Sequence, residues 1–123
     1  MIKRLEIEGV HMNVGEDLKK YAYKKIGGLE KYVPKHARSS LHVEVKLKEG
    51  KAKNKDERTC EVIMHLPQEI ITVSETTVNM FAAVDIVEEK LKTQLRKYKD
   101  IRTDHRLHQR LLAKLRRSSA VYD

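Results

Sequence analysis

Hydrophobic and polar residues alternate with a period of two along several short stretches of the chain. This alternation is typical of β-strands that bury one face and expose the other to solvent. The lysine-rich residues 49–56 between two of these stretches are expected to form a solvated hairpin loop. The predicted strands are residues 2–8, 41–48, 60–66 and 70–74.

Two further stretches have the period of an α-helix. Residues 16–32 place their apolar side chains on one stripe, and residues 78–99 form the longest helical pattern, with Asn79 as a side-chain N-cap. The consecutive Gly27 and Gly28 weaken the first helix, because each glycine inside a helix costs about 1 kcal/mol relative to alanine. We therefore expect a kink or local fraying at the two glycines.

The order of these elements is β-α-β-β-β-α, which predicts an α+β fold. Both helices can pack on one face of a four-stranded sheet, because the first βα unit crosses over and the other strands need only hairpins. With 123 residues the chain is long enough for a single core. We expect one domain over residues 1–100, followed by a basic tail, partly helical or disordered, over residues 101–123.

The chain is strongly basic, with 26 Lys and Arg residues against 18 Asp and Glu residues and a formal net charge of +8. Such a surface attracts polyanions, so nucleic acid is the first partner to consider. Lys25 interrupts an apolar stripe, either because its stem packs at the core edge or because its charge is needed beside the other helix. Side-by-side helices would join their bases into one positive surface: Lys19, Lys20, Lys24, Lys31, Lys90, Lys92, Arg96, Lys97 and Lys99.

The sequence does not favour catalysis. It has no nucleophile elbow, phosphate-cradling glycine loop or catalytic carboxylate pair, so we expect a protein that is not an enzyme and has no cofactor. His105 and His108 lie one helical turn apart, but without a nearby cysteine or third histidine they predict no metal site. The lone Cys60 cannot form an internal disulfide, and its apolar neighbours indicate a thiol in the core.

The absence of any membrane-length apolar run and of a signal-peptide pattern predicts a cytoplasmic protein with no membrane partner. Double-stranded RNA, read by its shape, suits a small α/β domain with basic helices. Sequence-specific binding of single strands fits less well, because such binding uses exposed aromatic platforms and the chain has no Trp. Two alternatives stay open: a general double-stranded RNA-binding module, and a regulator whose basic surface meets an acidic protein.

Several motifs occur at consistent separations along residues 2–100. They are Gly9-Val10-His11, Leu18, Lys25-Ile26, Leu29-Glu30-Lys31-Tyr32, Glu61-Val62, Met80-Phe81-Ala82-Ala83-Val84-Asp85, Lys90-Leu91, Gln94-Leu95 and Lys97-Tyr98-Lys99. Together they resemble the family of ribosome hibernation-promoting factors and ribosome-associated translation inhibitors. The resemblance implies a fold like that of double-stranded RNA-binding domains. It also implies binding to 16S rRNA of the small ribosomal subunit, at the mRNA and tRNA channel, and silencing of translation under starvation or in stationary phase.

The resemblance also implies which residues contact rRNA. Lys25, Lys90 and Lys97 match basic positions of the family motif, whereas Gly28 and Thr93 stand where the family usually has bases. The partners implied are the small subunit and the 70S ribosome, with a monomer expected away from the ribosome. Long members of the family add a C-terminal dimerisation domain, and this chain resembles the short class. With bases added from helical geometry, the candidate rRNA-binding set is Lys24, Lys25, Lys90, Lys92, Arg96, Lys97, Lys99 and Arg102.

Overall fold

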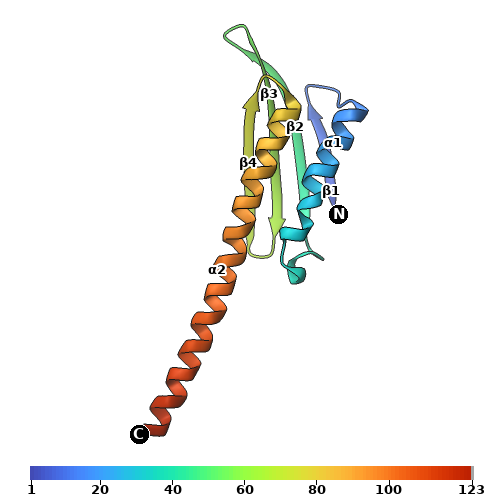
Figure 1. The fold of residues 1–123 in the computed structure, drawn as a ribbon. Helices are drawn as coiled ribbons and strands as arrows, with labels where there is room; N and C mark the ends of the chain where they lie inside the picture. Colours follow the sequence, from blue (N-terminus) through green and yellow to red (C-terminus); the bar gives the residue numbers. More distant parts are fainter. Residues whose placement is uncertain (123) are drawn as a thin grey trace.

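The computed structural model describes the backbone of residues 1–122 and the side chains of residues 1–101. Its elements follow the predicted order, which confirms the α+β fold class (Figure 1). They are β1 (Leu5–Val10), α1 (Glu16–Gly27), the 3-10 helices η1 (Gly28–Tyr32) and η2 (Lys35–Ala37), β2 (His42–Ala52), β3 (Lys55–Leu66), β4 (Glu69–Thr77) and α2 (Met80–Tyr122).

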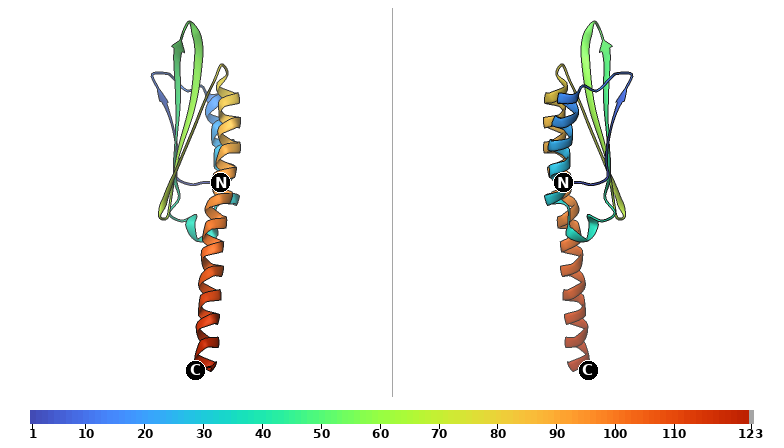
Figure 2. Two further views of the ribbon diagram at one scale, coloured as in Figure 1. Left: turned by 90° about the vertical axis from the view of Figure 1, so that its left-hand side faces the viewer. Right: turned by 90° about the vertical axis from the view of Figure 1, so that its right-hand side faces the viewer.

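The four strands form one mixed sheet in the order β1-β2-β3-β4. β1 runs parallel to β2, because α1 crosses over between them, and the β2-β3 and β3-β4 pairs are antiparallel hairpins. Both helices cover the same face of the sheet and lie side by side, while the other face is left uncovered (Figure 2). The predicted placement of the two helices is therefore confirmed.

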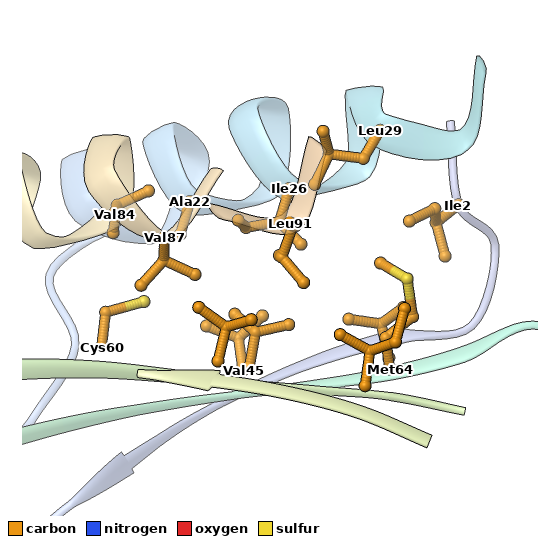
Figure 3. Packing of buried hydrophobic residues seen from close by; sticks show 14 of the residues in the cluster. Ile2, Ala22, Ile26, Leu29, Val45, Cys60, Met64, Val84, Val87 and Leu91 are labelled. Atoms are coloured by element: carbon orange, nitrogen blue, oxygen red, sulfur yellow. The ribbon is translucent and has the colours of Figure 1, made fainter. Parts of the chain in front are cut away.

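The core lies between this covered face and the two helices (Figure 3). The period-two pattern directs Val45 of β2 and Cys60 of β3 into it, and the helical stripes supply Ile26 and Leu91. All four side chains are fully buried, and burial of each of the three aliphatic ones contributes about 1.5–3 kcal/mol. Cys60 is free and fully buried, which confirms the expectation of a core thiol, and this burial raises the pKa of the thiol to about 12.

The first helix is shorter than its pattern predicts. α1 ends at Gly27, and the chain continues as the 3-10 helix η1 up to Tyr32. The two glycines lower the helix propensity at this point, and the tighter winding still allows Leu29 and Val33 to be buried in the core. The expected disruption at the glycines is therefore a change of helix type.

The expected loop at residues 49–56 is wrong, because β2 and β3 stay paired as far as Ala52 and Lys55. Only Lys53 and Asn54 form the turn, with φ angles of 53° and 66°. Left-handed conformation at both central residues is typical of the two-residue turns that match the twist of paired strands. The sequence does not alternate between apolar and polar residues at these strand ends, because every side chain there is exposed.

Other strand boundaries shift for related reasons. β4 extends from Glu69 to Thr77 and is longer than the predicted 70–74, since its backbone keeps pairing with β3 beyond the core. β1 begins at Leu5, because the chain before it is held to α1: the amide of Ile2 donates to the carbonyl of Gly27 at 3.1 Å.

The long helix α2 begins as predicted. The side-chain oxygen of Asn79 accepts a hydrogen bond from the amide of Phe81 at 2.9 Å, which confirms the N-cap. The backbone of α2 is helical as far as Tyr122, and its second half extends away from the sheet (Figure 1). In the part of the chain that the structure describes, no helix is both long and apolar enough to span a membrane.

Candidate nucleic-acid interface

The seam between α1 and α2 contains the lysine that interrupts the apolar stripe. Lys25 Nζ lies 3.8 Å from Asp85 Oδ1 and 4.0 Å from Glu88 Oε1, both on α2. The hydroxyl of Tyr21 donates to the Asp85 carboxylate, and this hydrogen bond raises the pKa of Tyr21. The same lysine lies 5.6 Å from the centre of the Tyr21 ring. The predicted position of Lys25 beside the second helix is confirmed, but two carboxylates face its charge.

Lys92 of α2, one helical turn after Glu88, also lies beside carboxylates and an aromatic ring. Its Nζ lies 3.1 Å from Glu89 Oε1 and 3.8 Å from Glu88 Oε1, and the hydrogen bond to Glu89 raises the pKa of Lys92. It also lies 5.8 Å from the centre of the Tyr32 ring, and Lys31 lies 5.3 Å from the same ring. The aromatic ring of η1 therefore has two cations beside it, one from each side of the seam.

Lys90 lies on the opposite flank of α2. Its ammonium group forms an ion pair with Glu75 of β4 and lies 3.4 Å from the carbonyl oxygen of Ser74. Lys97 follows seven residues later, which is about two helical turns, so it lies on the same flank. The structure therefore does not bring Lys90 and Lys97 together with Lys25.

The expectation of one continuous positive surface is corrected by these contacts. Ion pairs with carboxylates engage Lys25 and Lys92 at the seam, so the seam is close to neutral, and a further ion pair engages Lys90 on the opposite flank of α2. The residue spacing along α2 could have predicted that acidic residues lie beside Lys92. Asp85, Glu88 and Lys92 are separated by three and four residues, so they share one flank of the helix.

The excess positive charge lies on either side of this neutral seam. Lys24, Arg96 and Lys97 are exposed and form no ion pair with a carboxylate among the described side chains. Lys19 and Lys20 extend the basic area on the outer face of α1, and Lys99 extends the one around Arg96 of α2. The side chain of Arg102 lies outside the described residues.

These two basic areas can bind an extended polyanion without base-specific contacts. Exposed ion pairs contribute only about 0–1 kcal/mol each, so phosphate can replace carboxylate as the partner of a seam lysine. The side chains of Lys25 and Asp85 are 36% and 50% exposed, so the pair between them belongs to this weak class.

The uncovered face of the sheet has a different chemistry. The rings of His42 and His65 stack at a centroid distance of 5.3 Å. His65 Nε2 lies 3.1 Å from Glu44 Oε2, and this hydrogen bond lowers the pKa of Glu44. No cluster of three or more potential metal ligands is found among the described residues, and the side chains of His105 and His108 lie outside them.

Comparisons with known proteins agree over most of the chain. The sequence model of the family described as "Sigma 54 modulation protein / S30EA ribosomal protein" matches residues 5–103. The ribosome hibernation promotion factor of Staphylococcus aureus is 30% identical over 96 residues, which cover 78% of this chain and 48% of that protein. The factor of the same name from Lactococcus lactis is 33% identical over 101 residues, covering 80% of this chain and 50% of that protein. The chain thus spans about half the length of these curated relatives.

Two solved structures share the fold. The N-terminal domain of Thermus thermophilus Protein Y is 24% identical, with a TM-score of 0.61, and the match covers 79% of this chain and 97% of that one. A ribosomal subunit interface protein from Coxiella burnetii is 22% identical, with a TM-score of 0.65, and the match covers 79% of this chain and 98% of that one. At these identities the likeness shows a common architecture.

Proposed function

Because the chain belongs to the Sigma 54 modulation protein / S30EA ribosomal protein family, we propose that it is a ribosome-associated hibernation factor. This membership confirms the family resemblance seen in the sequence motifs, and the family is non-enzymatic. In the proposed function the protein binds 16S rRNA of the small subunit where mRNA and tRNA pass. It silences translation there when cells starve or enter stationary phase.

The proposed mechanism is occupancy. The basic areas on the outer face of α1 and around Arg96 of α2 contact phosphates, through Lys24, Arg96 and Lys97 first. Lys25 and Lys92 then exchange carboxylate partners for phosphates, and the cost is small for Lys25 because its pair with Asp85 is exposed. The bound domain excludes mRNA and tRNA sterically. Family membership over residues 5–103 is the observation that carries this proposal.

Co-sedimentation with purified 30S and 70S particles tests the proposal. We expect the protein to pellet with both particles at about 100 mM salt and to dissociate steeply as salt rises, because each phosphate contact releases a counterion. Complete recovery in the supernatant at the lower salt concentration would end the proposal.

A charge-removal variant tests the surface. Lys24→Gln, Arg96→Gln and Lys97→Gln together should weaken ribosome binding by roughly tenfold or more, because three phosphate contacts are lost. The matched control removes three exposed lysines of the β2-β3 hairpin tip, Lys51, Lys53 and Lys55, by the same change to Gln. Equal weakening by the two variants would mean that net charge alone, and not this face, drives the binding.

Two rival functions have separate tests. A general double-stranded RNA-binding module should be displaced from ribosomes by an excess of unrelated duplex RNA, whereas a ribosome-specific factor should stay bound. The family description also names modulation of a sigma factor, which favours the alternative of a protein partner. Stable co-elution with purified sigma 54 after RNase treatment would support that alternative over ribosome binding.

A further inference from the structure

A cavity of about 430 Å³ lies at the end of the sheet where β1 and β2 begin. Because these two strands are parallel, the segments that precede them, residues 1–4 and 38–41, meet at the same edge. The cavity is distinct from the α1-α2 seam. Its lining residues are Lys3, Arg4, Glu30, Arg38, Ser39 and Leu41.

The charges around this cavity are unbalanced. Its lining has one carboxylate, that of Glu30, which already lies 3.6 Å from the N-terminal amino group. No ion pair joins Lys3, Arg4 or Arg38 to a carboxylate among the side chains of residues 1–101. Three cations that share one cavity repel one another, so a bound anion would stabilise their arrangement.

The local backbone holds the guanidinium of Arg38 and the start of β1 in place. Arg38 Nε donates to the carbonyl oxygen of Val33 at 3.0 Å, and Nη2 lies 3.5 Å from the carbonyl oxygen of Lys31. A guanidinium group has five N–H donors in a planar fork, so other donors of Arg38 remain for a ligand. On the opposite side, the carbonyl oxygen of Arg4 accepts a hydrogen bond from the amide of Val43 at 2.9 Å, which anchors the start of β1.

We propose that this cavity is a binding site for a phosphate group that carries a nucleoside. The guanidinium fork of Arg38 suits two phosphate oxygens at once, and the charges of Lys3 and Arg4 complete the anion site. A volume of about 430 Å³ is larger than a phosphate alone needs and falls within the usual range of small-ligand sites. The buried side chain of Leu41 gives the site an apolar wall. The phosphate belongs either to a free nucleotide or to an RNA strand, and the two sources share this chemistry.

Titration of the full chain, followed by the NMR shifts of its backbone amides, tests the proposal. The three ligands are inorganic phosphate, AMP and a short duplex RNA. We expect saturable shifts at Lys3, Arg4 and Ser39. Lys3→Gln combined with Arg4→Gln should raise the Kd roughly tenfold, since each exposed charge interaction is worth about two- to fivefold. Both side chains are exposed, so this variant keeps the fold.

The control variant, Lys51→Gln with Lys53→Gln, removes the same charge from the hairpin tip and should leave the Kd unchanged. If AMP gives saturable shifts of these amides and duplex RNA gives none, the site binds free nucleotides. If duplex RNA gives the shifts and AMP does not, the site binds RNA. The proposal is overturned if neither AMP nor duplex RNA gives saturable shifts at this cavity, or if inorganic phosphate binds as tightly as AMP and RNA. It is also overturned if the control variant loses as much affinity as the Lys3 and Arg4 variant. No ribosome is present, so the result does not depend on the proposed function.

Discussion

Removing the carboxylates that face Lys25 should tighten the binding of polyanions. Asp85→Asn combined with Glu88→Gln deletes both acidic partners of this lysine, at 3.8 and 4.0 Å, and leaves side chains of nearly the same shape. An asparagine at position 85 still accepts the hydrogen bond from Tyr21. The Lys25 and Asp85 side chains are 36% and 50% exposed and the Glu88 side chain is 15% exposed, so we expect the fold to lose about 1 kcal/mol in stability.

The size of the effect follows from the charges. Each carboxylate repels a phosphate about 9 Å away by roughly 0.5 kcal/mol in water. Adding a few tenths of a kcal/mol for the released ammonium brings the total to about 1.4 kcal/mol, which is roughly tenfold in affinity. One new phosphate contact also steepens the slope of log affinity against log salt concentration by about 0.9. A fourfold rise in salt should therefore lower the affinity of the variant by an additional factor of about 3.5.

Fluorescence anisotropy with labelled duplex RNA, and co-sedimentation with 30S particles, at about 50, 100 and 200 mM salt measure both quantities. The matched control is Glu8→Gln with Glu57→Gln, which adds the same net charge at two exposed carboxylates away from the helices. If the seam variant binds no more tightly than the control and its salt slope is unchanged, Lys25 does not contact phosphate and the reasoning about the seam is wrong.

Three further predictions concern the core and the uncovered face. Leu91→Ala, at a fully buried position between α2 and the sheet, should lower the free energy of unfolding in urea by about 2–5 kcal/mol, whereas Ile86→Ala at a 37% exposed position should cost less than about 1 kcal/mol. Burial raises the pKa of Cys60 from 9.0 to about 12, so above pH 9 the unfolded chain binds fewer protons than the folded one, and stability should fall as pH rises towards 12. This fall should be smaller in Cys60→Ala, and equal pH dependence in the two proteins would contradict the assignment. His65→Ala should return the lowered pKa of Glu44 towards its ordinary value, which carboxyl NMR titration measures. In the intact protein Glu44 contributes stability above its ordinary pKa, and that contribution is lost as pH falls through its folded pKa.

The sequence by itself determined the order of the elements, the buried stripes and the start of α2. Val45 and Leu91 are buried where their periods place them, because alternation and the 3.6-residue turn are local properties of the backbone. Asn79 caps α2 for an equally local reason, since its side chain bonds an amide two residues away. The length of the β2-β3 hairpin was harder to predict, because backbone pairing continues where no side-chain pattern marks it.

Only the tertiary structure decided which charges meet. Lys25 and Asp85 are far apart in the sequence, as are Lys90 and Glu75, and no spacing along the chain predicts that they pair. The gathering of cations around Arg38 arises in the same way, from segments that precede two parallel strands. Charge compensation depends on distances of a few ångströms across the fold, whereas hydrophobic patterns can be recognised one turn or one strand at a time.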